Sequence, residues 1–495
     1  MVSLKQPAQR PAHSDREQVP LQLPLVVDLD GTLIRADLLV ESVLALLRKQ
    51  PLYLFLLPLW LMRGKARFKR EVACRTSLDI ATLPWRIPFI DYLSRQRSQG
   101  RSLVLATASD MHFARQVAEH LQLFDRVLAS DGVANLRGEV KRNRLVGMFG
   151  ERGFDYAADG GGFGRHDLSV WGSARQAILV NPTARVRSKA ARVAEIDRIF
   201  ADQKTALTDR LRALRPAHWL KNLLVLAPLF ASHKFRDVAL IEKSLLAFVA
   251  FGCCASSGYL FNDLFDLEAD RHHPQKRFRP FASGELPVSY ALIAMPVLLA
   301  LGCALGVLVS PLLLAILLLY VGLSAGYTLH VKKVAILDVL FLAGLYTVRI
   351  LAGSAATNIW PSHWLLAFST FLFFSLALVK RYSELVIMKR VDGDSAKARA
   401  YELGDGELLA AMGAASGYLA VLVLALYIAT YHARTLYATR EVLWMLCPLL
   451  LYWISYVWLT AHRGKMPGDP VEFATGDRTS RILIVLMLIT AAAAL

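Results

Sequence analysis

The chain has few cysteines and few acidic residues for its length. Its 495 residues include 5 cysteines, of which Cys253 and Cys254 are adjacent within an apolar run. This pattern provides neither a metal-binding nor a disulfide framework. The 40 acidic residues are outnumbered by 57 lysines and arginines, so the formal net charge is +17. No basic and aromatic nucleic-acid module accompanies that charge, and we expect no nucleic-acid partner.

The N-terminal end lacks an apolar core. Because residues 1–23 are polar and proline-rich, we expect a disordered tail there and not a signal peptide. Residues 24–200 differ in kind from the apolar remainder and are predicted to form a separate domain. A linker over 201–214 would join this domain to a second one over 215–495.

Apolar segments follow closely on one another from Trp219 onward, in a chain that is 55% apolar. Several approach the ~20 residues that span a bilayer. Lysines and arginines concentrate in alternate connections, while the other connections carry only Lys234, Arg236, Arg434 and Arg440. By the positive-inside rule the N-terminal domain is cytoplasmic and the C-terminus is outside. We therefore expect a multi-pass protein of a bacterial inner membrane, with nine helices at about 219–232, 241–262, 289–309, 311–328, 335–356, 362–379, 409–432, 441–461 and 480–495.

Three aspartates, Asp263, Asp266 and Asp270, follow one another at i, i+3 and i+7 near the end of an apolar segment. On a helix this spacing places them on one face. Carboxylates at a membrane edge are costly unless they bind something, and Mg²⁺ carrying a diphosphate is their natural ligand. The basic run from Arg271 to Pro280 adds cations for phosphate oxygens. The sequence therefore predicts chemistry on a diphosphate-bearing small molecule at a membrane.

Two further aspartates follow a short apolar strand near the N-terminus. The strand over 25–27 runs directly into Asp28, and Asp30 lies two residues later. One carboxylate can attack a phosphoryl group while the other acts as general acid and base, with Mg²⁺ between them. This arrangement predicts phosphoryl chemistry in the N-terminal domain.

Other residues could complete that site. A second strand over 102–106 ends in Thr107, whose hydroxyl can hold a phosphate oxygen. Lys141 follows a turn and can neutralise the transferring phosphate. Asp159 and Asp167 can complete a metal site.

These motifs resemble those of the haloacid-dehalogenase superfamily of phosphohydrolases over about residues 24–185. The resemblance implies an α/β Rossmann-like sheet with a helical cap at about 37–98. It implies a nucleophile, an acid/base, a phosphate-binding hydroxyl and a lysine at Asp28, Asp30, Thr107 and Lys141, and Mg²⁺ ligands at Asp28, Asp30, Asp159 and Asp167. A glycine-rich extension at 160–164 departs from the family pattern. Two interpretations follow, an active phosphatase or a regulatory remnant.

The predicted cap contains an apolar stretch from Pro51 to Met62, followed by a basic run that includes Arg63 and Lys65. The stretch is too short to span a bilayer. We interpret it as buried cap helices with a solvated basic end. The alternative is a cap that rests on a membrane surface beside anionic lipid.

The C-terminal half resembles the UbiA superfamily of intramembrane prenyltransferases. Its entry motif runs from Arg215 to Asn222, and the acidic motif runs from Asn262 to Asp270. The resemblance implies nine helices around a central cavity open to lipid, with Mg²⁺ and diphosphate at the cytoplasmic mouth.

A second motif distinguishes branches of that family. Aromatic prenyltransferases usually carry a second aspartate cluster after the fourth helix, whereas this chain has Lys332, Lys333 and a single Asp338. With the basic run after the first motif, this resembles the polyprenyl-phosphate phosphoribosyltransferase branch, which makes decaprenylphosphoryl-5-phosphoribose. In that branch a polyprenyl phosphate lipid is the acceptor, and the diphosphate belongs to 5-phosphoribosyl-1-diphosphate.

The resemblance implies roles for individual residues. Asp263, Asp266 and Asp270 would hold Mg²⁺, and Asp338 would stabilise or orient positive charge on the ribose. The substrate-binding candidates are Lys221, Asn262, Arg271, Lys276, Arg277, Arg279, Lys332 and Arg349. Positive charge required only by topology explains Lys332 equally well. Lys380 and Glu384 are expected to form a helix-surface pair.

The favoured hypothesis is a bifunctional membrane transferase. It would transfer a phosphoribosyl group to polyprenyl phosphate, and the phosphatase-like domain would remove the 5-phosphate, as for a cell-wall arabinan precursor. The first alternative is transfer of a prenyl group to an aromatic acceptor in quinone-type biosynthesis. The second is a catalytically silent membrane scaffold. The sequence does not specify an oligomeric state.

Overall fold

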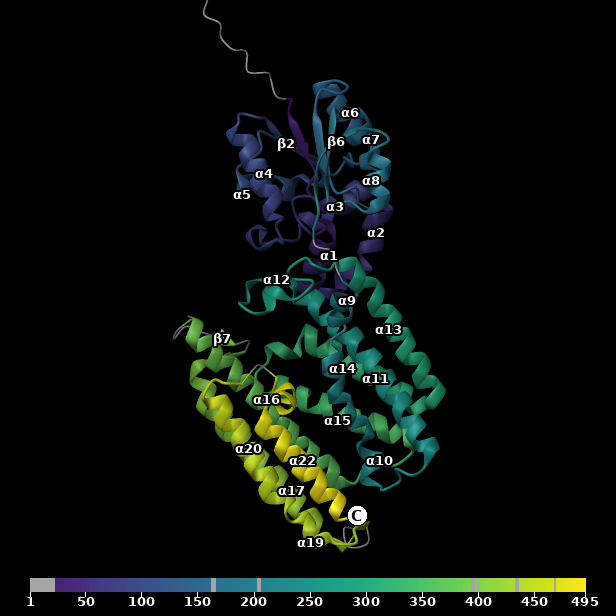
Figure 1. Ribbon diagram of the computed structural model, residues 1–495, viewed down its shortest axis with the longest axis vertical. Helices are drawn as coiled ribbons and strands as arrows, with labels where there is room; N and C mark the ends of the chain where they lie inside the picture. Colours follow the sequence, from purple (N-terminus) through teal and green to yellow (C-terminus); the bar gives the residue numbers. More distant parts are fainter. Residues whose placement is uncertain are drawn as a thin grey trace, which may run out of the picture. The chain divides into compact units, whose positions relative to one another are not determined.

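A computed structural model of the protein describes residues 23–161, 166–202, 206–392, 397–398, 400–431, 436–466 and 469–495. The chain forms two compact units, residues 1–204 and 205–495 (Figure 1). Each unit has its own hydrophobic cores. The predicted tail up to residue 22 and residues 162–165 of the glycine-rich extension lie outside the described residues.

The first unit contains a six-stranded parallel sheet in the order β3-β2-β1-β4-β5-β6. The strands are β1 (Leu25–Val27), β2 (Leu103–Asp110), β3 (Arg126–Ser130), β4 (Asp155–Ala158), β5 (Gln176–Val180) and β6 (Glu195–Phe200). The sheet confirms the predicted parallel α/β architecture. Because the chain leaves β1 toward β2 and later returns to its other side as β4, the strand order reverses at β1. Ligands bind at such a reversal, beyond the carboxyl ends of the strands.

Helices cover both faces of this sheet (Figure 1). Alternating residues of β1 face opposite sides, because Leu25 and Val27 belong to one hydrophobic core and Val26 to the other. The first core includes residues of α4 (Ile87–Ser98) and α5 (Met111–Leu121). The second includes residues of α6 (Glu139–Phe149), α7 (Asp167–Ser173) and α8 (Ala184–Ala190). A strand buried on both faces must be apolar throughout, as the predicted strand is.

The segment between β1 and α4 is helical. It comprises α1 (Leu38–Lys49), η1 (Pro51–Phe55), α2 (Leu57–Met62), α3 (Lys65–Ala73) and η2 (Ile80–Thr82). Asp37 begins α1 by accepting backbone hydrogen bonds from Leu39 and Val40. The preferred interpretation of the Pro51 to Met62 stretch as buried is wrong, because most of its apolar side chains are exposed.

The second unit is almost entirely helical. Its elements are α9 (Leu207–Ala213), η4 (Pro216–Leu226), α10 (Ala227–Ala231), α11 (Val238–Phe265), α12 (Leu267–His272), η5 (Lys276–Phe278), α13 (Val288–Val309), α14 (Pro311–Leu329), η6 (Val331–Lys333), α15 (Leu337–Thr357), α16 (His363–Asp392), β7 (Lys397–Ala398), β8 (Tyr401–Glu402), η8 (Leu403–Asp405), α17 (Gly406–Ala429), α19 (Arg440–Leu443), α20 (Leu446–His462), α21 (Pro470–Gly476) and α22 (Arg478–Ala493).

Seven helical segments in the described residues are long and apolar enough to cross a membrane. They contain α11, α13, α14, α15, α16, α17 and α20, so seven of the nine predicted spans have helices of the expected kind. The other two predicted spans are shorter. Residues 219–232 fold into parts of η4 and α10, and 480–495 into the 16-residue α22.

The segment η4 packs closely against α15. A Cβ atom on Gly353 of α15 would lie 1.9 Å from the backbone oxygen of Val225 in η4. Only glycine permits this approach, which small residues commonly provide between membrane helices. The contact fixes η4, and with it the entry motif, against the membrane helices.

Candidate functional site

The first unit gathers the predicted phosphoryl-transfer residues at the carboxyl ends of β1, β2 and β4. Lys141 of α6 lies with its Nζ 3.0 Å from Oδ1 of Asp28, and also donates a hydrogen bond to the Tyr156 hydroxyl at 3.0 Å. The Tyr156 hydroxyl in turn donates to Asp167 at 2.8 Å. A chain of polar contacts therefore connects the predicted nucleophile, the lysine and one predicted metal ligand.

Asp30 is held by groups from two segments. Its Oδ1 accepts a hydrogen bond from the backbone N–H of Leu38 at 2.9 Å, and its Oδ2 accepts one from the Ser109 hydroxyl at 2.5 Å. Burial, with the charges of Asp37 and Asp28, raises the pKa of Asp30 to about 7. A carboxyl group with this pKa can hold or release a proton near neutral pH, as a general acid and base must. The Thr107 hydroxyl accepts a hydrogen bond from the backbone N–H of Ser109, whose side chain contacts Asp30.

Asp159 and Asp167 are also buried near other carboxylates. Burial and the charges of Asp167 and Asp28 raise the pKa of Asp159 to about 7. Burial and the charge of Asp28 raise that of Asp167 to about 6. Asp159 packs against Gly31, where a Cβ atom would lie 2.2 Å from its Oδ2. Gly31, directly after Asp30, also has a φ of +72°, so glycine is favoured at this position.

Whether Mg²⁺ fits this group depends on its donor atoms. Among the residues the structure describes, no three or more histidine, cysteine or acidic side chains are already arranged to hold a metal ion. Asp28, Asp159 and Asp167 nevertheless provide hard oxygen ligands, and each pair repels strongly enough to raise a pKa. A divalent cation would remove that repulsion, so the donor set fits Mg²⁺.

The raised pKa values predict a loss of stability at high pH. An acid whose pKa is raised by folding contributes stability below its unfolded value of 3.8, and loses it as pH rises through about 6 to 7. Hydrogen exchange of β4 in the full-length protein, corrected for intrinsic rates, should show less protection at pH 8 than at pH 5. The change should be of the order of 1 kcal/mol per unit of pKa shift.

Mg²⁺ at pH 8 should restore much of this protection, and Asp159→Asn should weaken the pH dependence. Asp197→Asn, at an exposed position on β6, serves as the matched control. Protection that is independent of pH in the unsubstituted protein would contradict the prediction.

The acidic motif of the second unit lies where α11 meets α12. Asp263 belongs to α11, Asp266 lies between the two helices, and Asp270 belongs to α12. The backbone continues nearly as one helix, because Asp270 N–H donates to the Asp266 carbonyl at 2.7 Å. Burial raises the pKa of Asp270, although Arg279 opposes it, and Asp263 and Asp266 add to the increase. The predicted gathering of the three carboxylates is therefore present.

Three cations surround these carboxylates. Arg279 Nη1 lies 2.6 Å from Asp270 and 3.5 Å from Asp263. Arg215 also pairs with Asp263, and Lys332 pairs with Asp266. The cations come from the entry segment, the basic run and the connection after α14, so three distant segments meet at this acidic cluster. The cluster is Asp263, Asp266, Asp270, Arg215, Arg279 and Lys332.

The acidic cluster supplies the oxygen donors that Mg²⁺ prefers. Asp263 and Asp270 both reach one guanidinium nitrogen, so their oxygens lie close enough to share a ligand. Each carboxylate is paired with an arginine or a lysine. When a Mg²⁺–diphosphate unit binds, Mg²⁺ can replace these cations at the carboxylates, and the phosphate oxygens can bind the released arginines and lysine. The residues therefore fit such a ligand.

A second group, the basic cluster, surrounds Asp469. Lys221 of η4 lies 2.5 Å from Asp469 Oδ2, and Lys380 of α16 lies 3.5 Å from the same atom. Burial would raise the pKa of Asp469, but Lys380 and Lys221 hold it well below its ordinary value. The expected pair of Lys380 with Glu384 is not the contact found, since Glu384 accepts from Arg381 at 2.6 Å.

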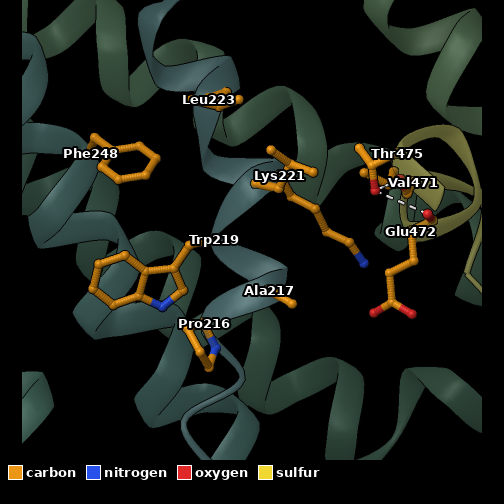
Figure 2. A pocket seen from close by; sticks show the side chains of 10 residues that line it. Pro216, Ala217, Trp219, Lys221, Leu223, Phe248, Val471, Glu472 and Thr475 are labelled. Carbon is orange, nitrogen blue, oxygen red and sulfur yellow. Dashed lines mark hydrogen bonds between the residues drawn. The ribbon is translucent and has the colours of Figure 1, made fainter. Parts of the chain in front are cut away.

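A groove lies beside the basic cluster. Its volume is about 370 Å³, and its lining includes Trp219, Lys221, Phe248 and Glu472. Figure 2 shows Lys221 extending toward the side of the groove formed by Glu472, with Trp219 and Phe248 on the other side. The groove thus combines an apolar wall with an ammonium group and a carboxylate, which suits an amphipathic ligand.

Arg349 completes the basic cluster inside α15. It donates to Asn222 Oδ1 at 3.0 Å and lies 5.1 to 5.4 Å from the rings of Phe251, Tyr320 and Tyr346. In the described part of the chain no carboxylate lies within ion-pair distance of Arg349, and Asn222 Nδ2 is buried without a hydrogen-bond partner. A buried charge of this kind is costly unless it is compensated, and such residues commonly mark a ligand pathway.

Asp338 lies in a different environment from the one predicted. It is fully buried, its Oδ2 accepts from Arg381 Nε at 2.5 Å, and its Oδ1 accepts from the Tyr401 hydroxyl at 2.5 Å. Arg381 also donates to Tyr327 and Glu384. Both oxygens are therefore engaged by protein groups, which indicates a positioning role between α15 and α16.

The remaining candidates have local partners. Asn262 Oδ1 accepts from the Thr328 hydroxyl at 3.2 Å, and Arg271 donates to the Ala282 carbonyl at 3.2 Å. Lys276 and Arg277 lie in η5, where the guanidinium of Arg277 is 4.8 Å from the ring of Phe278. These contacts do not by themselves assign a substrate to the four residues.

Sequence reasoning missed several residues of both sites. In the first unit these are Tyr156, Ser109 and Lys69, and in the second they are Arg215, Lys380, Arg381, Tyr401 and Asp469. The entry motif begins at Arg215, so the sequence contained a signal that could have identified this arginine as a site residue. Asp469 is buried and pairs with Lys221 across 248 residues, so local spacing provides no signal for it.

These features define a membrane-embedded transferase with an N-terminal parallel α/β domain. Residues 224–475 match the UbiA prenyltransferase family, and the chain belongs to that family of transferase enzymes. Because this is a family of transferase enzymes, its match argues against the alternative of a catalytically silent membrane scaffold.

The chain is also similar to individual proteins of known sequence or structure. The chain is 34% identical to the uncharacterized protein y4nM of Sinorhizobium fredii, over 97% of this chain and 92% of that protein. It is 31% identical to the decaprenyl-phosphate phosphoribosyltransferase of Mycobacterium tuberculosis, over 57% of this chain and 93% of that protein. Among solved structures it resembles a UbiA homolog from Archaeoglobus fulgidus bound to GPP and Mg²⁺, at a TM-score of 0.42, 16% identity and coverage of 57% and 99%.

Proposed function

We propose that the membrane domain transfers a 5-phosphoribosyl group from 5-phosphoribosyl-1-diphosphate to a polyprenyl phosphate. The observation that carries this proposal is the pairing of an acidic cluster with a separate basic cluster that has more cations than carboxylates. Lys221 and Lys380 share the carboxylate of Asp469, and the buried Arg349 has no carboxylate partner among the described residues. A prenyl diphosphate and a neutral aromatic acceptor need one phosphate site, whereas the proposed substrates carry phosphates at three places. Similarity to a phosphoribosyltransferase supports the same choice.

The two clusters divide the work of the reaction. The acidic cluster would hold the diphosphate, with Arg215, Arg279 and Lys332 turning from the aspartates toward phosphate oxygens. Mg²⁺, when bound, would neutralise charge on the departing diphosphate. Lys221 and Arg349 would bind the lipid phosphate and orient one of its oxygens toward the anomeric carbon of the ribose. A new carbon–oxygen bond forms there as the bond to diphosphate breaks.

The segment η4 connects these clusters. Arg215 precedes it and reaches the acidic cluster, while Lys221 and Asn222 belong to the basic cluster. At the rise of a 3₁₀ helix, six residues span roughly 12 Å, a distance comparable to a phosphorylated ribose with its diphosphate. This spacing supports one substrate bridging both clusters.

The N-terminal domain is proposed to be a haloacid-dehalogenase-like phosphatase that removes the 5-phosphate of the lipid-linked product. Asp28 would attack phosphorus while Lys141, 3.0 Å away, neutralises the phosphoryl oxygens. Asp30, with a pKa of about 7, would protonate the leaving ribose oxygen and then activate water. Both sites would face the cytoplasm of a bacterial inner membrane. Joining the two domains would raise the local concentration of the second substrate.

The direct test uses membranes that contain the full-length protein. They are supplied with radiolabelled 5-phosphoribosyl-1-diphosphate, polyprenyl phosphate and Mg²⁺, and label is followed into the lipid phase. Label in lipid supports phosphoribosyl transfer. No label, together with turnover of a prenyl diphosphate and an aromatic acceptor, would overturn the proposal in favour of quinone-type prenyl transfer.

Asp28→Asn should change the product without stopping transfer. The labelled lipid should accumulate with its 5-phosphate retained, because the nucleophile for phosphate removal is lost. We expect removal to fall by about 10²-fold or more, as for loss of a nucleophile. Asp91→Asn, at an exposed position on α4, should leave the product unchanged. Equal phosphate content in the lipid products of the unsubstituted protein, Asp28→Asn and Asp91→Asn would contradict an active phosphatase.

A further inference from the structure

The predicted cap presents an unusual apolar surface, formed by Leu52, Leu54, Phe55, Leu56, Leu59, Leu61 and Met62 of η1 and α2. We refer to it as the cap apolar surface. Met62 is 84% exposed, Phe55 is 73% exposed and Leu52 is 66% exposed. Single exposed apolar residues are common on proteins, but a contiguous group marks a contact surface.

This surface is not the side on which the segment packs within its own domain. Trp60 is buried and forms a small core with Leu46 of α1 and Val72 of α3, joined by Tyr53 and Leu57. One apolar face of the segment therefore packs against α1 and α3, and a second apolar face is exposed. A helix that only packed onto its own domain would carry polar residues on that second face.

Charge immediately after this surface indicates its partner. Arg63, Lys65 and Arg67 follow Met62 and are all exposed. No acidic residue occurs from Pro51 to Arg70. Apolar side chains beside lysines and arginines are the pattern of segments that lie in a membrane interface and attract anionic lipid. Twelve helical residues extend roughly 18 Å, too short to cross the ~30 Å apolar core of a bilayer.

We propose that the cap apolar surface inserts into the headgroup region of an anionic phospholipid bilayer, with Arg63, Lys65 and Arg67 on the lipid phosphates. The protein already spans a membrane through its second unit, so this surface can meet a bilayer without recruitment from solution. The insertion does not depend on which reaction the protein performs. A neutral protein partner would not explain the uninterrupted basic flank.

A consequence for the substrate rests on the proposed phosphatase function. The chain leaves the cap apolar surface through Gly64 into α3, and Lys69 of α3 reaches the candidate phosphatase site. Its Nζ donates to the Ala108 carbonyl at 2.5 Å and to Asn135 Oδ1 at 2.9 Å. Only a short stretch of chain separates the lipid-facing residues from the site. A lipid-linked phosphomonoester could therefore reach the site without leaving the bilayer.

The test measures lipid contact directly. Met62→Cys is made in full-length protein carrying Cys74→Ser, labelled with bimane and placed in nanodiscs of phosphatidylglycerol with or without brominated acyl chains. Bromine quenches the label only on contact, so we expect emission at position 62 to fall about twofold or more in brominated nanodiscs. Signal from the other cysteines is subtracted with the Cys74→Ser parent.

Val133→Cys provides the matched control. Val133 is 92% exposed in the loop after β3 of the same unit and is not part of the cap apolar surface, so its label should be unaffected by bromine. Equal absence of quenching at both positions would overturn the proposal. A label at position 62 that is shielded from water but not quenched would assign the surface to a protein contact instead, which also overturns it.

A second measurement separates this inference from the proposed phosphatase function. Leu59→Glu with Met62→Glu should slow phosphate release from a lipid-linked substrate about tenfold, and leave release from a soluble aryl phosphate unchanged. Val133→Glu should change neither rate. Quenching at position 62 without activity on either substrate would refute the phosphatase and retain the membrane contact. Equal loss on both substrates would refute delivery from the bilayer.

Discussion

Asp266→Asn is expected to lower phosphoribosyl transfer by about 10²- to 10³-fold while the protein remains folded. Asp266 lies at the junction of α11 and α12 and pairs with Lys332. Asp266 is the middle of the three aspartates of the acidic cluster. Replacing it would remove one negatively charged oxygen ligand from a Mg²⁺–diphosphate unit held by the cluster. Asparagine keeps the size of the side chain but supplies only a neutral oxygen.

The stability cost of this change should be small. The side chains of Asp266 and Lys332 remain 18% and 15% exposed, so water still reaches the pair, and we expect a smaller cost than for a fully buried pair. Label transfer into lipid should therefore fall without a comparable change in thermal unfolding, and excess Mg²⁺ should recover part of the rate. Glu268→Gln removes an exposed acid from α12, two residues after Asp266, and should retain activity. Full activity of Asp266→Asn would exclude the proposed metal site.

Asp338→Asn is expected to destabilise the membrane domain by about 3 kcal/mol, because it breaks a fully buried ion pair and leaves Arg381 with Glu384 as its remaining carboxylate partner. Asp338 and Arg381 are 0% and 1% exposed, and their side chains lie 2.5 Å apart. Asparagine cannot neutralise the guanidinium, and the Tyr401 hydroxyl also loses a charged acceptor. Thermal unfolding in detergent or nanodiscs would show the loss as a large decrease in Tm.

A paired substitution identifies the cause of that decrease. Asp338→Asn combined with Arg381→Gln removes both charges and should recover part of the lost stability. Ser383→Ala on the same helix is a control for a small buried change, since the Ser383 hydroxyl has no hydrogen-bond partner among the described residues. If Asp338→Asn abolished transfer but left Tm unchanged, Asp338 would act on the substrate, as the sequence predicts, and the positioning role would be refuted.

Local patterns in the sequence predicted much of the fold. The apolar strand before Asp28 and the parallel sheet follow from short buried runs that must be apolar on both faces. Seven membrane helices follow from the length of their apolar segments. The spacing of Asp263, Asp266 and Asp270 predicted that they would share one side of a nearly continuous helix. These features depend on residues close together in the chain, whose geometry is set by the backbone.

Local sequence patterns did not predict the orientation of the apolar stretch in the predicted cap. Composition identified Pro51 to Met62 as apolar and helical, but it could not assign which side faces the domain core. In the structure Trp60 packs inward while Met62 faces outward. An apolar helix with two apolar sides has no periodic signal for its orientation.

The sequence by itself determined the helices, the strands and the presence of two acid-bearing motifs. Tertiary structure alone decided which charges meet. Asp263 pairs with Arg215, 48 residues away, and Asp266 with Lys332, 66 residues away. Lys221 and Asp469 meet across 248 residues. Such pairs depend on how separate helices pack, as where Gly353 admits η4 against α15. Side-chain partners of this kind are fixed by packing at long range, which local spacing does not encode.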